Sequence, residues 1–196
     1  MRQQLILGST SPFRKELLER LCIPFICDTP NIDETPLENE SPNDYVKRLS
    51  LEKARAVAKN HPDALIIGSD QCSVLKGQIR GKPGNHKNAI KQLRESSAER
   101  VSFLTGLCLL DSRSNTFQLD MIPFHVDFRE LTNSEIESYL RAEEPYFCAG
   151  SFKSEGLGIS LFERLQGDDP TALIGLPLIS LSNMLRKQGV LIPAPS

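Results

Sequence analysis

The chain has 196 residues, of which 39% are hydrophobic and 24% are charged, as is usual for a soluble globular protein. Its formal net charge of -2 and its lack of long runs of like charge argue against a nucleic-acid-binding protein, which needs many cations to neutralise phosphates. The length suits a single domain over residues 1–196, or two lobes that share one core, and we expect a single domain.

The first third of the chain alternates strand-like and helix-like segments. Its first apolar run is too short for a secretory signal or a membrane span, so we expect a cytoplasmic protein with no membrane partner. The predicted elements are a strand (Leu5–Leu7), a helix capped by Ser11, a strand (Ile23–Cys27), an acidic loop (Asp28–Glu40) and a helix from Ser41 to about Asn60.

The remainder contains longer strand-like runs. The predicted elements are a strand (Leu65–Leu75), a turn (Lys76–Gly77), a loop (Gly81–Gly84), a helix (Asn85–Glu95), a hairpin (Val101–Asp111 and Thr116–Phe128), a helix with a capping box (Thr132–Glu135), a strand (Gly158–Leu165), a helix from Pro177 to Gly189 and a frayed end (Ile192–Ser196). The alternation followed by a hairpin predicts an α/β (mixed α+β) fold, with a mixed sheet and helices packed on it.

The five cysteines, at positions 22, 27, 72, 108 and 148, are odd in number and irregularly spaced. No C-x-x-C pair occurs, and the histidines are scattered. We therefore expect reduced, mostly buried thiols rather than disulfides or zinc ligands.

Asp70 interrupts the apolar run Leu65–Leu75, which otherwise suits a buried strand. An unpaired carboxylate in an apolar environment is costly, so a cation, a metal or hydrogen-bond donors should lie close to Asp70.

Two predicted helices each carry a cation on the face expected to be buried. Arg14 lies three and four residues before Leu17 and Leu18, and Lys53 lies seven residues after Val46. Either side chain alone could lay its stem over the core and carry its charge to water. Both together, with Asp70 on a neighbouring strand, are explained more simply by one charged cleft.

Three further residues fit such a cleft. Glu34 lies in the acidic loop, Lys82 lies in a glycine- and proline-rich loop, and Ser9 lies between a strand and a helix start, where phosphate can bind. Ser11 is explained more simply as the helix cap. The Walker and G-x-G-x-x-G patterns are both absent. Converging charges of both signs predict a polyanionic ligand and a metal.

The order and spacing of short motifs resemble those of the Maf-like nucleoside triphosphate pyrophosphatases over nearly the whole chain. The motifs are Leu7-Gly8-Ser9-Thr10-Ser11-Pro12-Phe13-Arg14, Asp33-Glu34, Glu52-Lys53-Ala54, Gly68-Ser69-Asp70, Gly81-Lys82-Pro83 and Gly175-Leu176-Pro177-Leu178. The resemblance implies an elongated, twisted sheet with two lobes around a central cleft. It also implies hydrolysis of the α-β phosphoanhydride of a nucleoside triphosphate, giving a monophosphate and pyrophosphate.

The resemblance assigns roles to the charged residues. Asp70 matches the catalytic acid/base, and Glu34 matches the acidic residue that joins Asp70 at a divalent metal cation, Mg²⁺ or Mn²⁺. The positions that match phosphate-binding residues of the family are Ser9, Arg14, Lys53 and Lys82.

The positions associated with substrate choice in the family are Phe13, Gln71 and Glu155. This triplet resembles the 7-methyl-GTP subgroup and differs at every position from the arginine, threonine and glutamine of the dTTP and UTP branch. Phe13 could stack on the cationic base and Glu155 could accept a hydrogen bond from it, whereas the subgroup usually has tryptophan in place of Phe13. Packing of Phe13 on Leu17 is the structural alternative.

The remaining expectations concern the backbone between Asp70 and Gln71, the alternative function and the binding partners. A regular strand would place Asp70 and Gln71 on opposite faces, so we expect a bulge or a strand end between them.

The alternative to an enzyme is a nucleotide-sensing or cell-division regulatory protein that uses the same cleft. The expected partner is a small nucleotide, and a homodimer is compatible with the sequence.

Overall fold

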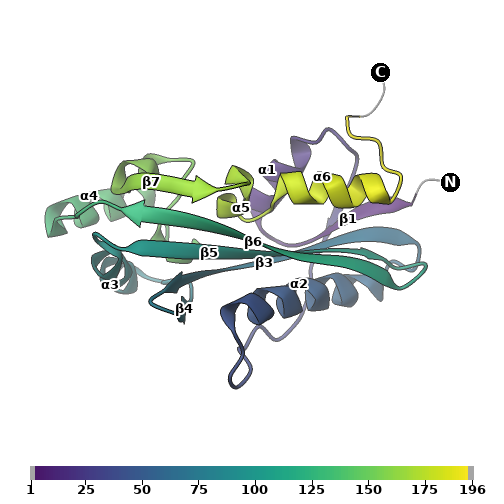
Figure 1. Cartoon of the computed structure of the whole chain (residues 1–196), viewed down its shortest axis with the longest axis horizontal. Helices are drawn as coiled ribbons and strands as arrows, with labels where there is room; N and C mark the ends of the chain where they lie inside the picture. The colour runs from purple at the N-terminus through teal and green to yellow at the C-terminus, as the bar shows by residue number, and fades with distance from the viewer. Residues whose placement is uncertain (1–2, 194–196) are drawn as a thin grey trace.

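The computed structural model describes residues 3–193 and is built on one mixed sheet of seven strands. The strand order is β2-β1-β3-β5-β6-β7, with β4 paired to the end of β3. Pairing is parallel from β2 through β1 to β3 and antiparallel elsewhere. The strands are β1 (Gln4–Gly8), β2 (Ile26–Asp28), β3 (Ala64–Leu75), β4 (Gln78–Arg80), β5 (Arg100–Asp111), β6 (Thr116–Phe128) and β7 (Phe162–Gly167). Figure 1 shows the elongated, twisted sheet that was predicted.

Helices cover both faces of one half of the sheet. Helix α2 (Pro42–Ala58) lies on one face, and α1 (Pro12–Glu19) and α6 (Leu178–Lys187) lie on the other (Figure 1). Because side chains alternate along a strand, Ile66 of β3 packs under α2 whereas Ile67 packs on the opposite side. This half of the molecule therefore has a core on each face of the sheet.

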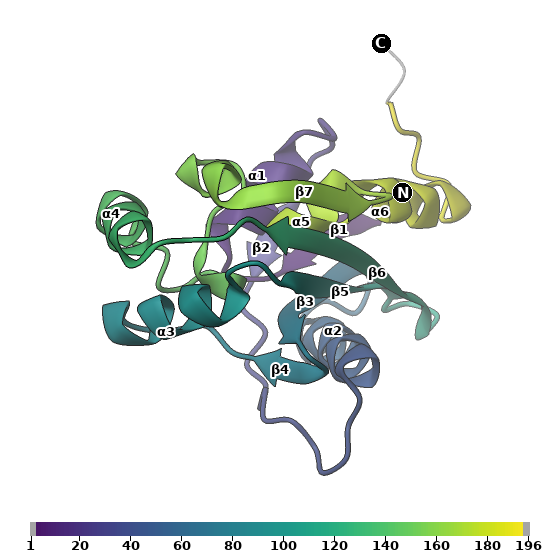
Figure 2. The ribbon, with the colours of Figure 1, turned by 60° about the vertical axis from the view of Figure 1, so that its left-hand side comes forward.

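The other half has its own core, formed by the far ends of β5 and β6 with α3 (His86–Ser96) and α4 (Asn133–Glu143). Figure 2 shows these two helices together at one end of the molecule. Phe128 and Phe152 pack edge to face within this core, with ring centroids 5.7 Å apart. Two halves that share one sheet match the two lobes expected from the family resemblance.

Helix α2 packs unusually close to the sheet because glycines lie beneath it. A Cβ on Gly68 would overlap the carbonyl oxygen of Ser50, and a Cβ on Gly106 would overlap that of Val46. The hydroxyl of Ser50 also accepts a hydrogen bond from the Asp70 amide at 3.0 Å. This close approach brings the side chains of α2 down to β3.

The predicted helix starts are confirmed. The Ser11 hydroxyl accepts from the Arg14 amide, and Thr132 forms a complete capping box with Glu135. The short elements that were not predicted include β4 and α5 (Pro170–Ile174). Both are too short to show a hydrophobic period.

Two predicted strands have different boundaries. β2 begins at Ile26 rather than Ile23, because Ile23 packs into the core and Pro24 has no N–H to donate to a ladder. The predicted strand Gly158–Leu165 is wrong in its first half, which is the 3-10 helix η2 (Leu157–Leu161). Gly158 lies so close to the Lys153 carbonyl that a Cβ would overlap it, as in a tight turn.

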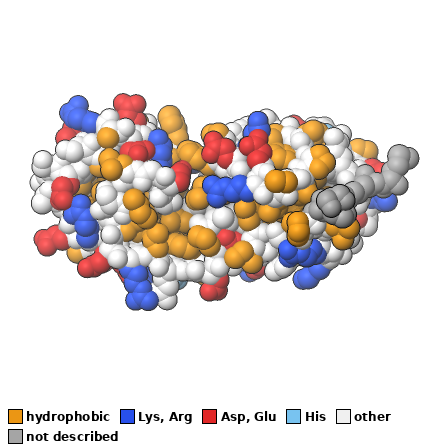
Figure 3. Space-filling view, turned by 90° about the horizontal axis from the view of Figure 1, so that it is seen from above, with side chains coloured by type: hydrophobic (Ala, Val, Ile, Leu, Met, Phe, Trp, Pro, Cys, Tyr) orange, Lys and Arg blue, Asp and Glu red, His pale blue; other side chains and the backbone are white. Residues whose placement is uncertain are grey.

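All five cysteines are free, as predicted, but they are not mostly buried: Cys72 and Cys108 are buried, Cys148 is half-buried, and Cys22 and Cys27 are exposed. Of the predicted frayed end, residues 194–196 lie outside the described residues, and Ile192 packs against the core. Among residues 3–193, no helix is both long and apolar enough to cross a membrane. Acidic and basic side chains are interspersed on the face that Figure 3 shows.

Candidate active site

The site lies beside the middle of β3, where one side of this strand has no neighbouring strand. β1 pairs with β3 as far as Gly68, and β4 pairs with β3 only from Ser73 onwards. Residues 69–72 of β3 are therefore paired with β5 alone. Side chains from both faces of β3 can reach a cleft that opens at this gap.

The prediction of a bulge or a strand end between Asp70 and Gln71 is wrong, because β3 runs without interruption from Ala64 to Leu75. The ladder to β5 continues unbroken, with Asp70 opposite Gly106 and Gln71 opposite Thr105. Asp70 thus lies on the α2 face and Gln71 on the other face. Both nevertheless line the same cavity, because the unpaired edge of β3 forms part of its wall. The sequence argument did not consider that a strand edge can expose both faces to one cleft.

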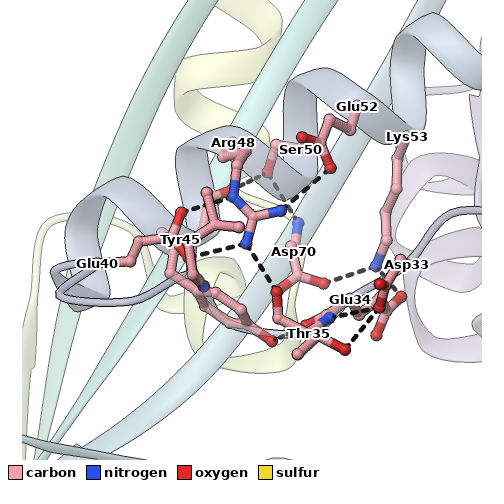
Figure 4. A network of polar contacts seen from close by, with 12 residues as sticks. Asp33, Glu34, Thr35, Glu40, Tyr45, Arg48, Ser50, Glu52, Lys53 and Asp70 are labelled. Atoms are coloured by element: carbon pink, nitrogen blue, oxygen red, sulfur yellow. Dashed lines mark hydrogen bonds and ion pairs between the residues drawn. The ribbon is translucent and has the colours of Figure 1, made fainter.

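Lys53 joins two carboxylates from different segments. Its Nζ lies 2.6 Å from Asp70 Oδ1 and 2.7 Å from Glu34 Oε1 (Figure 4). Side-chain exposure is 7% for Lys53 and 10% for Asp70, but 54% for Glu34, so Glu34 lies at the mouth of the cleft. Burial raises the pKa of Glu34, but the hydrogen bond and charge of Lys53 outweigh it, so that its pKa falls below the usual value.

Two further cations face this cluster. Burial lowers the pKa of the Arg14 guanidinium, and the negative charges of Asp70 and Glu34 partly offset that effect. Arg14 Nε donates to the Gly175 carbonyl at 2.8 Å, which fixes the direction of its side chain. Lys82 is exposed, and its charge contributes to the lowered pKa of Glu34.

Two adjoining cavities, of about 270 and 490 Å³, together form the cleft. They share Phe13, Arg14, Glu34, Lys53 and Lys82. The smaller also contains Asp70, Gln71 and Glu155, whereas the larger reaches Ser9 at the start of α1. Every site residue predicted from the sequence therefore lies on one continuous cleft.

Gln71 has a fixed amide orientation. Its Nε2 donates to the carbonyls of Ala172 and Leu173 at 2.8 and 3.0 Å, and to Thr105 Oγ1 at 3.0 Å. Carbonyl oxygens accept only, so the nitrogen must face them. Oε1 has no hydrogen-bond partner among residues 3–193. Every buried side-chain nitrogen and oxygen in that range has a partner, so Oε1 is not buried and can accept a hydrogen bond from a ligand. Gln71 thus presents a hydrogen-bond acceptor.

The structure adds residues that sequence reasoning missed. Phe147 lines both cavities, and 76% of it is exposed. Tyr45 lines the smaller cavity from α2. No pattern in the sequence marks Phe147, because it lies in an irregular segment where side-chain direction has no period. Tyr45 precedes the apolar residue Val46 on α2 and could have been found from its place beside the stripe.

The carboxylates of Glu34 and Asp70 suit a hard metal ion that binds together with a phosphate-bearing ligand. No group of three or more His, Cys, Asp or Glu side chains within residues 3–193 is placed to hold a metal alone. Glu34 and Asp70, however, converge on one point, which Lys53 Nζ occupies. Mg²⁺ is commonly held by one or two carboxylates together with phosphate oxygens, so this pair fits such an ion.

Comparison with known proteins places the chain among relatives. The sequence model of the Maf-like protein family matches residues 4–188. The chain belongs to this family.

Relatives within this family are similar over nearly their whole length. A 7-methyl-GTP pyrophosphatase from Pseudomonas syringae pv. tomato is 57% identical over 96% of this chain and 98% of its own. A 7-methyl-GTP pyrophosphatase from Colwellia psychrerythraea is 54% identical over 95% of this chain and 93% of its own. In each of these two alignments, more than half of the aligned residues are identical.

A solved structure, that of the Staphylococcus aureus Ham1 protein, resembles the fold with a TM-score of 0.53. It covers 95% of this chain and all of that one, at 10% sequence identity. At this identity the likeness concerns the fold alone.

Proposed function

We propose that this Maf-like protein is a nucleoside triphosphate pyrophosphatase that cleaves the α-β phosphoanhydride of 7-methyl-GTP. The observation that carries the proposal is the contact of Lys53 with both Asp70 and Glu34 in a cleft that Arg14 and Lys82 also line. A cluster of acidic and basic side chains suits a triphosphate that binds as its complex with a metal ion. The names of the similar relatives support the choice of substrate.

The cations act on the triphosphate. Lys53, Arg14 and Lys82 come from α2, α1 and the loop after β4, so they approach the chain of phosphates from several sides. Positive groups placed where charge builds up stabilise the transition state more than the ground state. Ser9 and the positive end of α1 extend this phosphate-binding end of the cleft.

Asp70 accepts a proton from the attacking water in this proposal. It is held by Lys53 and by the packing of α2, so little reorganisation is needed when the reaction begins. Mg²⁺ or Mn²⁺, held by Glu34, Asp70 and phosphate oxygens, would supply further positive charge to the phosphates.

The base would lie at the other end of the cleft. N7-methylated guanine is cationic, so the aromatic faces of Phe13 and Phe147 and the carboxylate of Glu155 attract it. Guanine also presents N–H donors on its Watson–Crick edge, and Gln71 Oε1 and Glu155 are acceptors. The base end therefore suits guanine better than adenine, whose ring nitrogen on that edge accepts.

The direct test is product analysis. Purified protein with Mg²⁺ or Mn²⁺ should release pyrophosphate from 7-methyl-GTP, and less efficiently from GTP, UTP and dTTP. Release of single phosphates instead would exclude cleavage of the α-β bond. Tight binding of a non-hydrolysable analogue with negligible turnover of every nucleotide would favour the sensing or regulatory alternative.

Asp70→Asn tests the proposed base. The substitution keeps the shape of the side chain but removes its basicity, so kcat should fall by about 100-fold or more while the circular dichroism spectrum is unchanged. Asp127→Asn is the matched control, because Asp127 forms an ion pair with Arg100 outside the cleft. A kcat for Asp70→Asn within a few-fold of the control would remove Asp70 from this role.

A further inference from the structure

Glu34 lies on a segment with little structure of its own. No helix or strand is assigned between β2 and α2, and the side chain of Glu34 is 54% exposed. A mobile loop would lose backbone entropy each time Glu34 met Lys53, which opposes the contact. Something must hold this part of the acidic loop in place.

Part of the restraint is local to the loop. Asp33 Oδ1 accepts from the Thr35 amide at 2.9 Å and from the Thr35 hydroxyl at 2.6 Å. This Asx-type turn bends the backbone around Glu34. It does not connect the loop to the rest of the protein.

The connection comes from two side chains of α2 on neighbouring turns (Figure 4). Tyr45 OH donates to the carbonyl of Glu34 at 3.0 Å. Arg48 Nη2 donates to the carbonyl of Thr35 at 3.2 Å. Burial and the charges of Asp70 and Glu34 raise the pKa of Tyr45 to about 12, so its hydroxyl stays protonated and able to donate.

Arg48 is itself fixed by carboxylates on both sides. Its Nε and Nη2 form a fork to Glu40 at 2.6 and 2.8 Å, and its Nη1 contacts Glu52 at 3.2 Å. Glu40 in turn accepts from the Leu37 amide at 3.0 Å. Arg48 thus ties the loop to α2 at two points, Thr35 and Glu40. A lysine in its place could not reproduce this planar fork.

We propose that Tyr45 and Arg48 are positioning residues, which hold Glu34 at the distance from Asp70 that triphosphate binding requires. The inference rests on the proposed function for its kinetic readout. Both residues lie on the helix that carries Lys53, so one rigid element sets Lys53 and the backbone of Glu34 together. The helix therefore aligns residues from the loop and the strand around one point.

The test is a double-mutant cycle with 7-methyl-GTP as the substrate. Arg48→Lys should lower kcat/KM about tenfold, and Tyr45→Phe about threefold, when Glu34 is present. In a Glu34→Gln background each substitution should change kcat/KM by less than about twofold, because the group being positioned is already altered. Equal losses in both backgrounds would overturn the proposal.

A matched control is available in Arg129, which contacts the Ser160 carbonyl at 2.8 Å and Glu135 at 2.8 Å at the far end of the molecule. Arg129→Lys should leave kcat/KM within about twofold of the original protein. If it lowers kcat/KM as much as Arg48→Lys does, loss of stability explains the result and the proposal fails.

Amide hydrogen exchange gives a readout that does not depend on turnover. Arg48→Lys should speed exchange in residues 35–40 at least about tenfold while the amides of β3 keep their protection. Unchanged exchange in this segment would overturn the role of Arg48. Absence of pyrophosphate release from the original protein would overturn the proposed function instead, and the exchange result would still decide whether the loop is held in this way.

Discussion

Lys53 shows how far the sequence can predict a single side chain. Helical periodicity predicted that it faces inward, and the structure buries it between Asp70 and Glu34. The period predicts which face of a helix is buried, however, and not how closely that helix packs on the sheet. The pairing became possible because glycines let α2 approach the sheet, which no local pattern reveals.

In the proposed site, Glu155 is the residue on which we expect a preference for a cationic base to depend most. Glu155→Gln removes the negative charge but keeps an acceptor, so the ratio of kcat/KM for 7-methyl-GTP over GTP should fall about tenfold, or ~1.4 kcal/mol. Glu163→Gln, an exposed substitution on β7 outside the cleft, is the control. An unchanged ratio for Glu155→Gln would show that the methyl group is recognised elsewhere.

Phe147 is expected to bind the base from the irregular segment that follows α4. Phe147→Ala should raise KM for 7-methyl-GTP about fivefold, since stacking on a base is worth about 1–3 kcal/mol. Because 76% of Phe147 is exposed, the melting temperature should hardly change. Phe117→Ala is the comparison, since Phe117 is 43% exposed on β6 and lines neither cavity. Equal KM values for the two variants would count against stacking.

At the scale of elements, the contact between α2 and the sheet sets the site. Gly68→Ala would force its Cβ into the Ser50 carbonyl, so α2 must move away and carry Lys53 from Asp70. We expect a loss of about 3 kcal/mol in the free energy of unfolding and a melting temperature lower by about 6–12 °C. The measurement is thermal unfolding followed by circular dichroism.

Gly81→Ala is the control for this prediction. A Cβ at Gly81 would meet nothing within 4 Å, and its backbone is not in the left-handed region. Its melting temperature should stay within about 2 °C of the original. A comparable loss for both variants would mean that the general effect of replacing glycine, and not the close approach of α2, explains Gly68→Ala.

Elements with a long hydrophobic period were predicted well, whereas several of the short ones were not. The long strands, the hairpin and the mixed sheet followed from the sequence, whereas β4 and α5 did not. Both short elements matter for the site, because β4 bounds the gap in the sheet and α5 supplies the carbonyls that orient Gln71. Their conformation depends on tertiary pairing, which local propensity does not encode.

The whole molecule is two halves joined by the sheet, with the cleft between them. The proposed phosphate-binding end includes Ser9 and Arg14 from the half that holds α1, and the proposed base end includes Phe147 and Glu155 from the half that holds α3 and α4. The family resemblance implied this arrangement, but only coordinates show that the gap between β1 and β4 creates it.

A ligand that contacts both halves should stabilise both at once. With the non-hydrolysable α,β-methylene analogue of 7-methyl-GTP and Mg²⁺ at about 100 times Kd, binding adds about 2.7 kcal/mol. The melting temperature should then rise by about 5–10 °C in a single transition. Scanning calorimetry measures this directly, with the same concentration of an ATP analogue as the comparison, for which we expect a smaller rise. Two transitions, of which only one responds to the nucleotide, would show that the ligand contacts one half alone and would contradict a cleft shared between them.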